Sequence, residues 1–267
     1  MLQIILGAYM KTLVFDLDGT CYRGSELIPG AKKLVDEAIE KQIPFLFLTN
    51  NSMRTPEENV VHMEKMGYRN LKPEQFYNSA MAAAEFVAAK EGSKKAWYIG
   101  ENGMKQALED NGFEITEEKP DYVFVGLDKK ADYRKYSKAL DLLLNGAKLI
   151  GTNKDRILAK PGGFEVGNGS VVAMFEYALN QKSPDISKPS PVMMDLFCRH
   201  FDLKKEDLIL IGDNLETDIA LGQNSGIQTL MVESGVHHRD DIDRLKIYPD
   251  QVVSDLSEVS AEQLTAI

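Results

Sequence analysis

Residues 12–20 read TLVFDLDGT, so that a run of β-forming residues, Thr12–Phe15, leads directly into two aspartates, Asp16 and Asp18. Such a run, bounded by polar and turn-forming residues, predicts a buried strand with carboxylates at its carboxyl end. Side chains two positions apart in a strand face the same side, so both carboxylates can address one pocket. Gly19 then lets the chain turn sharply, because glycine lacks the Cβ that restricts other residues.

The same alternation of apolar runs and helical periods continues along the chain. Strands are expected at 44–48, 96–99, 122–125, 148–151, 208–211 and 228–232. Helices are expected at 29–42, 56–66, 79–90, 132–145, 170–180 and 191–200, with shorter ones that end at Gly112 and Gly226. Strands that alternate with helices are typical of parallel sheets. The sequence therefore predicts an α/β protein, with a Rossmann-like parallel-sheet core and an inserted smaller α/β cap domain.

The length of 267 residues favours two domains over one. We expect a core made of residues 1–78 and 184–267, interrupted by a cap at residues 79–183 that has strands and helices of its own. Residues 161–170, PGGFEVGNGS, are expected to form a glycine-rich loop of the cap. Residues 1–9 precede a second methionine, Met10, and we interpret them as an upstream extension without chemistry.

Composition and charge narrow the classes of partner. The formal net charge is −10 and no dense Lys/Arg run offsets it, which argues against nucleic acid as the main partner. No apolar run approaches the roughly 20 residues that a membrane-spanning helix needs. Cys21 and Cys198 form neither a disulfide pattern nor a zinc pattern, so reduced thiols in a cytoplasmic protein are expected. A homo-oligomer is compatible with the sequence.

Polar residues follow three of the predicted strands. Asp16 and Asp18 follow the first strand, Thr49 and Asn50 end the second, and Asp213 follows a later one. In open parallel sheets, ligands bind beyond the carboxyl ends of the strands, so we expect these residues to form one site. Close carboxylates repel each other and require a cation or a shared proton. Mg²⁺ fits this need, because it is bound through one or two carboxylates together with phosphate and water.

Three further groups complete the predicted site. The Thr49 hydroxyl and neighbouring N–H groups suit phosphate oxygens, although TNNS alone also makes an ordinary turn or helix cap. Lys188, in KPSP, offers a compact cation for a phosphate dianion, although a lone lysine in a loop is usually solvated. Asp218, in GDNLETD, is expected to orient Asn214 or Lys188, or to cap the helix that follows.

In this order the motifs resemble those of the haloacid dehalogenase-like phosphatases: DLDGT, a strand ending in Thr49, then Lys188, then GDNLETD. The stretches LTNNS, YNSAMAAAEF, GNGS and GDNLETDIALGQNSGI, and the place of the insert, are similar to the NagD-like and 4-nitrophenylphosphatase-like branch. The resemblance covers the chain from Met10 onward. It implies a phosphatase that hydrolyses phosphate monoesters through an aspartyl phosphate.

The resemblance also implies a role for each motif residue. Asp16 is the nucleophile that attacks phosphorus, and Asp18 is the acid and base that moves protons. Mg²⁺ is held by Asp16, the main-chain carbonyl of Asp18 and the carboxylate of Asp213. The transferred phosphoryl group is bound by Thr49, Asn50 and Lys188.

The expected substrates are small phosphorylated metabolites: sugar phosphates, nucleotides or p-nitrophenyl phosphate. Residues 153–170 of the cap are expected to face the site and to choose between them. In relatives specialised for pyridoxal phosphate we expect a histidine in this segment, where this chain has Ile157 and Leu158, and the departure counts against that substrate. The four histidines are interpreted as surface or packing residues, and Trp97 as part of the cap core.

Three other functions share parts of the pattern. A dehalogenase of this fold would lack Asp18 and need no metal. A phosphomutase usually carries a helical cap after the first motif. A receiver-like phosphorylation sensor combines an Asp cluster with Thr and Lys in a much shorter chain. Asp18, Asp213 and the position of the insert favour the phosphatase.

Overall fold

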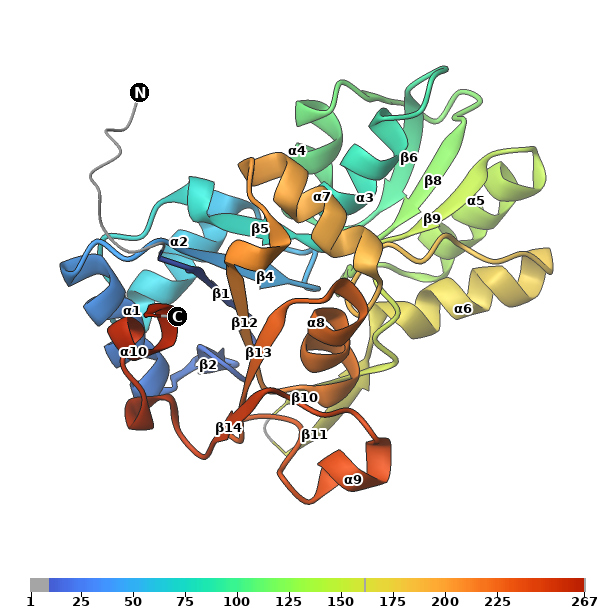
Figure 1. The fold of residues 1–267 in the computed structure, drawn as a ribbon. Helices are drawn as coiled ribbons and strands as arrows, with labels where there is room; N and C mark the ends of the chain where they lie inside the picture. Colours follow the sequence, from blue (N-terminus) through green and yellow to red (C-terminus); the bar gives the residue numbers. More distant parts are fainter. Residues whose placement is uncertain (1–9, 161, 267) are drawn as a thin grey trace. The chain divides into compact units, whose positions relative to one another are not determined.

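The computed structural model describes residues 10–160 and 162–266, so the predicted upstream extension at 1–9 lies outside the described residues. The chain forms two compact units. The first contains the described residues of Met1–Phe47, Met66–Asn70 and Leu203–Ile267, and the second contains those of Leu48–Lys65 and Leu71–Asp202. Both units hold strands of a parallel sheet together with helices (Figure 1).

The larger sheet has the strand order β14-β13-β12-β1-β4-β5. Its strands are β1 (Thr12–Phe15), β4 (Phe45–Thr49), β5 (Phe76–Asn78), β12 (Leu208–Gly212), β13 (Gln228–Val232) and β14 (Gln251–Val253). β1 pairs in parallel with both β4 and β12, and β13 and β14 extend the sheet in parallel on the side of β12. The boundary between the units falls within β4, after Phe47. The predicted α/β class is confirmed.

Helix α1 (Pro29–Glu40) has apolar residues at the spacing of a helix that buries one face. Its buried face includes Ala31, Leu34, Val35 and Ala38, as the spacing predicted. Pro29 occupies its first turn, where the missing N–H of proline costs no hydrogen bond. The shorter helices α8 (Ala220–Ser225), α9 (Asp241–Leu245) and α10 (Ala261–Thr265) also belong to this unit.

The second unit contains a four-stranded sheet with the order β7-β6-β8-β9. Its strands are β6 (Lys95–Ile99), β7 (Glu114–Ile115), β8 (Tyr122–Val125) and β9 (Lys148–Gly151), all parallel. The helices of this part are α3 (Ser79–Ala88), α4 (Asn102–Asp110), α5 (Tyr133–Leu144) and α6 (Asn168–Leu179). All of these elements lie within the predicted cap, whose bounds at 79 and 183 stay a prediction.

The side chains of alternate residues of β8 pack on opposite faces of this sheet. Val123 and Val125 pack in a buried cluster with residues of α5 and α6, and Trp97 packs against that cluster. On the other face, the Phe124 ring lies 5.4 Å from the ring of Phe113, which follows α4. This alternation follows from the two-residue period of a strand.

A hairpin replaces most of the predicted glycine-rich loop. β10 (Ile157–Lys160) and β11 (Gly163–Val166) pair antiparallel, and α6 begins at Asn168 rather than at residue 170. The prediction of a loop at 161–170 was therefore wrong in part. Its glycines suggested a loop, although Phe164 and Val166 within it, and Ile157 shortly before it, are residues that favour strands. Ile157 and Phe164 are exposed, so the usual alternation between buried and polar positions was absent.

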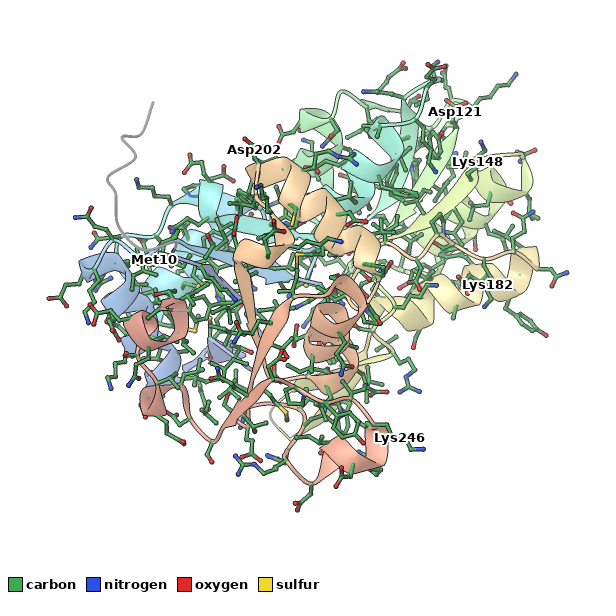
Figure 2. The ribbon with its side chains drawn as sticks, viewed as in Figure 1. Met10, Asp121, Lys148, Lys182, Asp202 and Lys246 are labelled. Atoms are coloured by element: carbon green, nitrogen blue, oxygen red, sulfur yellow. The ribbon has the colours of Figure 1, made fainter. Side chains whose placement is uncertain are left out.

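The remaining helices of the second unit are α2 (Pro56–Lys65) and α7 (Pro191–Phe201). Lys182, which follows α6, lies at the surface (Figure 2), where its Nζ pairs with Glu176 Oε2 at 2.7 Å. Within the described part of the chain, the helices are too short or too polar to cross a lipid bilayer.

Candidate active site

Asp16 and Asp18 leave the carboxyl end of β1 with different exposure. The Asp16 N–H donates to the carbonyl of Ile211 in β12 at 2.9 Å, so the sheet pairing continues one residue past β1 and holds Asp16 in place. Asp16 is buried, whereas Asp18 is exposed. A sharp turn follows, in which the Gly19 N–H donates to the carbonyl of Tyr22 at 2.7 Å. Asp18 is thus the more accessible of the two carboxylates.

Three buried carboxylates come together in the first unit. Oxygens of Asp16, Asp213 and Asp218 all lie within 4.8 Å of one another. Burial and mutual repulsion both disfavour three negative charges at this spacing, so the group requires a cation or bound protons. Carboxylate oxygens are hard ligands, and the set fits a divalent cation of the Mg²⁺ type.

Asp213 is held by two hydrogen bonds and by two close backbone approaches. Its Oδ1 accepts from Thr20 Oγ1 at 3.1 Å, and its Oδ2 accepts from the Val236 N–H at 2.7 Å. A Cβ added at Gly19, where φ is +97°, would come within 2.4 Å of Oδ2, and one at Gly235 within 1.8 Å. Glycine is therefore required at both places, because any side chain would displace this carboxylate.

Asp218 sits on a π-helical turn, η3 (Leu215–Ile219), that follows β12. Its Oδ2 accepts from the Asn214 N–H at 3.2 Å, which is one of the contacts that the sequence allowed for. Sequence reasoning missed its approach to Asp16 and Asp213. A π-helical turn changes which side chains share a face, and the motif GDNLETD alone gives no sign of that turn.

Cys21 lies directly behind Asp16 and is not exposed. Its Sγ is 3.2 Å from the main-chain oxygen of Asp16, and the Tyr68 hydroxyl donates to the Cys21 carbonyl at 2.8 Å. Burial, and then the negative charge of Asp16, raises the pKa of the Cys21 thiol well above its ordinary value. The thiol therefore stays protonated and packs beneath the site, since a reactive cysteine needs a lowered pKa.

Thr49, Asn50 and Lys188 form a second set of residues, within the second unit. The Asn50 side chain binds both main-chain groups of Lys188: its Oδ1 accepts from the Lys188 N–H at 3.1 Å, and its Nδ2 donates to the Lys188 carbonyl at 3.2 Å. Lys188 is only 3% exposed, and its Nζ donates to the Leu48 carbonyl at 3.0 Å. It is therefore not a solvated surface lysine. Thr49 Oγ1 accepts from the Asn51 N–H at 3.1 Å.

Three side chains hold Asn50: Asn153 and Asp155, which lie in the segment 153–170 that was expected to face the site, and Ser79, which was not singled out. Asn50 Nδ2 donates to Asp155 Oδ1 at 3.2 Å, and the Asn50 carbonyl accepts from Ser79 Oγ at 2.6 Å and from Asn153 Nδ2 at 2.7 Å. Residues 153–155 thus contact the TNNS loop directly. Their sequence, NKD, is too ordinary to mark them as partners of a loop about a hundred residues earlier.

Comparison with known proteins identifies the family. A model described as haloacid dehalogenase-like hydrolase matches residues 13–114, and one described as HAD-hydrolase-like matches residues 185–259. An acid sugar phosphatase of Staphylococcus epidermidis is 35% identical over 255 residues, which cover 95% of this chain and 98% of that protein. An acid sugar phosphatase of Staphylococcus aureus is 34% identical over 253 residues, covering 94% and 97%.

Solved structures agree. NagD from E. coli superposes with a TM-score of 0.85 at 31% identity, covering 94% of this chain and 99% of that one. A 4-nitrophenylphosphatase from Thermotoga maritima superposes with a TM-score of 0.86 at 31% identity, covering 94% and 96%. With the parallel sheets and the motifs at their strand ends, these likenesses show that the chain belongs to the haloacid dehalogenase-like hydrolases and is a phosphatase.

Proposed function

We propose that this phosphatase hydrolyses small phosphate monoesters with the help of Mg²⁺, through an aspartyl phosphate at Asp16. The observation that carries the proposal is the group of three buried carboxylates at the carboxyl end of β1. A buried carboxylate at a strand end is well placed to act as a nucleophile, and its neighbours supply ligands for a cation.

Asp16, the main-chain carbonyl of Asp18 and the Asp213 carboxylate are the proposed ligands of Mg²⁺. Asp218 lies close enough to Asp16 and Asp213 to act on the same ion, directly or by orienting Asn214. The ion neutralises charge, which matters because an anionic carboxylate must approach an anionic ester.

The reaction divides into two displacements at phosphorus. In the first, a carboxylate oxygen of Asp16 bonds to phosphorus while the bond to the leaving oxygen breaks, and Asp18 gives its proton to that oxygen. In the second, Asp18 takes a proton from water as the water oxygen attacks phosphorus, which releases phosphate and restores Asp16. Splitting one difficult step into two is the general benefit of a covalent intermediate. The exposure of Asp18 suits a group that must reach both leaving group and water.

Thr49, Asn50 and Lys188 are the proposed holders of the transferred phosphoryl group. Phe47 of β4 pairs with Phe15 of β1. Thr49 comes two residues after Phe47, and Asp16 comes one residue after Phe15. Parallel pairing of β1 with β4 supports this assignment, because ligands of parallel sheets bind beyond the carboxyl ends of the strands. The Asn50 side chain is engaged with Lys188, so we assign its contact with phosphate to the main-chain N–H.

We further infer that sugar phosphates, nucleotides and p-nitrophenyl phosphate are candidate substrates. The names of the relatives, acid sugar phosphatase and 4-nitrophenylphosphatase, support the first and the last of these. We place the reaction in the cytoplasm, with small phosphorylated metabolites as its partners.

Release of p-nitrophenol from p-nitrophenyl phosphate tests the proposal. The purified chain should be inactive with EDTA and regain activity with Mg²⁺, while Ca²⁺ should support it poorly, since Ca²⁺ prefers more ligands and looser geometry. Acid quenching during turnover of a ³²P-labelled ester should trap label on the protein, and an Asp16→Asn variant should trap none. Equal rates with EDTA and with Mg²⁺ would remove the metal from the proposal.

A further inference from the structure

A pocket lies at the carboxyl edge of the four-stranded sheet, within the second unit. The chain moves from β6 to β7 on one side of β6 and then to β8 on the other, so the topological switch point falls between β6 and β8. Ile99 at the end of β6 and residues 126–129 after β8 line the pocket. Ligands of open parallel sheets bind at such a point. We call this cavity the edge pocket.

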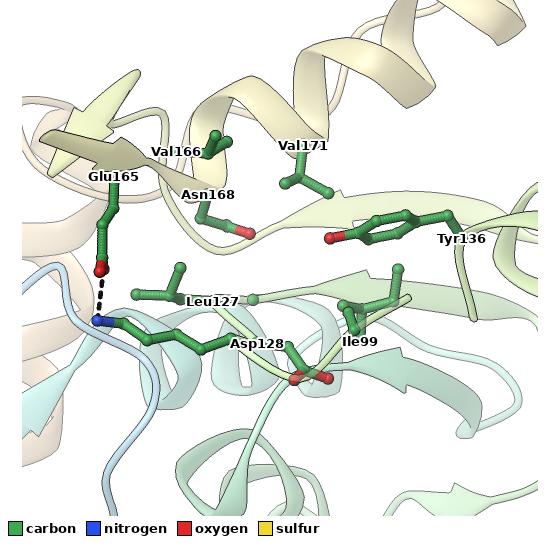
Figure 3. A pocket seen from close by; sticks show the side chains of 11 residues that line it. Ile99, Leu127, Asp128, Tyr136, Glu165, Val166, Asn168 and Val171 are labelled. Atoms are coloured by element: carbon green, nitrogen blue, oxygen red, sulfur yellow. Dashed lines mark hydrogen bonds and ion pairs between the residues drawn. The ribbon is translucent and has the colours of Figure 1, made fainter. Parts of the chain in front are cut away.

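The edge pocket has the size and lining of a site for a small metabolite. Its volume of about 260 Å³ lies just below the roughly 300–1,000 Å³ of typical ligand sites. Figure 3 shows the side chains of Asn168 and Tyr136 pointing toward each other across it, with Ile99, Leu127 and Val171 also in its lining. Polar groups placed among apolar side chains are typical of a site that orients a ligand.

Asn168 contributes an acceptor that the described protein does not satisfy. Its side chain is 1% exposed, and its Nδ2 donates to the Val125 carbonyl at 3.0 Å and contacts Thr152 Oγ1 at 3.2 Å. A carbonyl only accepts hydrogen bonds, so the Val125 contact fixes which end of the amide is nitrogen. The buried Oδ1 then has no hydrogen-bond partner among the described residues. Leaving a buried acceptor unpaired is costly, so a ligand that donates a hydrogen bond here gains affinity.

The charged residues of the edge pocket are paired with each other or with a neighbour. Asp128 Oδ2 lies 2.6 Å from Lys135 Nζ, and its side chain is 4% exposed. Lys129 Nζ lies 2.6 Å from Glu165 Oε2, the contact that the dashed line marks in Figure 3. These two acids and two bases sum to no net charge. The lining therefore favours a neutral polar group over a phosphate.

We propose that the edge pocket binds a neutral hydroxylated molecule of the size of a monosaccharide or smaller. One hydroxyl donates to Asn168 Oδ1 and another meets the Tyr136 hydroxyl, while carbon-bound hydrogens lie against Ile99, Leu127 and Val171. Burial, and then the charge of Asp128, raises the pKa of Tyr136, so its hydroxyl stays protonated and able to donate.

The hydroxylated group has two sources: the sugar part of a phosphate ester, or a free sugar that binds beside the reaction. The first source rests on the proposed function. It is supported within the second unit by the Leu127 N–H, which donates to Ser52 Oγ at 3.0 Å and ties the pocket wall to the loop that begins at Thr49. The second source does not depend on hydrolysis.

The first arm of the test measures binding without catalysis. Glycerol, D-ribose and D-glucose are titrated into the whole protein and followed by saturation-transfer NMR. The matched pair of variants is Tyr136→Phe, which removes one hydroxyl from the pocket, and Tyr133→Phe, which removes one from an 85% exposed residue of the same helix. Loss of one hydrogen bond should weaken binding about 3- to 10-fold in Tyr136→Phe, with no change in Tyr133→Phe. Ala131→Met, which fills the pocket, should weaken binding further.

The second arm measures kcat/KM for ribose 5-phosphate and glucose 6-phosphate relative to p-nitrophenyl phosphate. If the sugar part of the substrate occupies the edge pocket, Tyr136→Phe lowers this ratio by the same about 3- to 10-fold. If a free sugar occupies it, binding falls and the ratio stays constant. If no probe binds and the ratio is the same in all variants, the pocket holds only solvent and the proposal is wrong. If the protein hydrolyses no ester but binds sugars through Tyr136, the proposed function is wrong and the proposed sugar site in the edge pocket is supported.

Discussion

Two parallel sheets of this molecule present a carboxyl edge, and the residues that follow their strands give the two edges different chemistry. After β1 and β12 come acids, so that three carboxylates lie within 4.8 Å of one another. After β8 comes GLDKK, in which Asp128 and Lys129 are each paired with an opposite charge. Strand ends of the same kind thus carry clustered carboxylates at one edge and paired charges at the other.

In both sheets the strand topology determines where polar residues gather, and the side chains at that place determine the charge of the edge. Both edges satisfy the rule that ligands bind beyond the carboxyl ends of parallel strands. Among the described residues, the edge after β1 carries three carboxylates at short range, and such a group requires a cation or bound protons.

Asp16→Asn should have the largest effect. An amide is no nucleophile toward phosphorus, so kcat for p-nitrophenyl phosphate should fall roughly 10⁴-fold or more, as when another enzyme loses its nucleophile. Steady-state rates with saturating Mg²⁺ measure this, and circular dichroism checks the fold. If the variant retained more than a few per cent of wild-type activity, the covalent mechanism would have to be abandoned.

Asp218→Asn should come next, because it removes one charge from the carboxylate group while keeping the side chain's size. If Asp218 supports the metal, the Mg²⁺ concentration for half-maximal activity should rise about 10- to 100-fold, the usual effect of losing an outer-shell partner. Asp243→Asn, on the exposed α9, is the matched control and should leave this concentration unchanged. An unchanged Mg²⁺ requirement in Asp218→Asn would limit Asp218 to orienting Asn214.

The acids after β1 and β12 could be predicted from the sequence, whereas the edge pocket after β8 could not, and the reason is physical. Asp16 and Asp213 each come at the end of an apolar run, so both the strand and the acid that follows it can be recognised in the sequence. Lys188 could be selected only from the order of motifs, since its burial depends on distant residues such as Asn50. The edge pocket rests on Asn168 and Tyr136, which are common helix residues, and no local pattern shows that they meet.

The same limit explains the errors of detail. The predicted strands end within one or two residues of the observed ends. An apolar run ends where the strand leaves the buried interior, so the sequence marks that point. The hairpin of β10 and β11 was missed, because its apolar residues are exposed and its glycines suggested a loop. Asp155 lies in the segment 153–170 that was expected to face the site, but its partner could not be predicted because Asn50 lies 105 positions away.

Asp155→Asn should have a moderate effect on Asn50 and Lys188, the proposed phosphate-binding residues of the second unit. Asp155 accepts a hydrogen bond from Asn50 Nδ2, and Asn50 in turn holds the main chain of Lys188. Loss of the charge should weaken the support of Lys188 and raise the inhibition constant for inorganic phosphate about 5- to 10-fold, in line with the net contribution of one hydrogen bond. Asp141→Asn, on the surface of α5, serves as the control. A fall in melting temperature without a change in phosphate inhibition would make Asp155 merely structural.

The smallest effect should come from the paired charges around α6, the helix that carries Asn168 at its start. Burial raises the pKa of Glu176, but hydrogen bonds from Lys182 Nζ at 2.7 Å and the Ser183 N–H at 2.9 Å outweigh it, so the pKa lies below its ordinary value of 4.5. A carboxyl whose pKa is lowered by folding stabilises the folded state above its unfolded pKa, and this stability is lost as pH falls through the folded pKa.

Glu176→Gln should therefore destabilise the protein by about 1 kcal/mol at pH 7, which corresponds to a fall in melting temperature of roughly 2–4 °C. The difference in melting temperature between variant and wild type should disappear as the pH is lowered from 4.5 toward 3, because both proteins then carry a neutral side chain at position 176. Glu118→Gln, at an exposed position, should show no gap at either pH. Melting temperatures by differential scanning fluorimetry at pH 7 and pH 3 decide the matter: a gap of equal size at both values would mean that shape and packing, rather than the charge of Glu176, hold this end of α6.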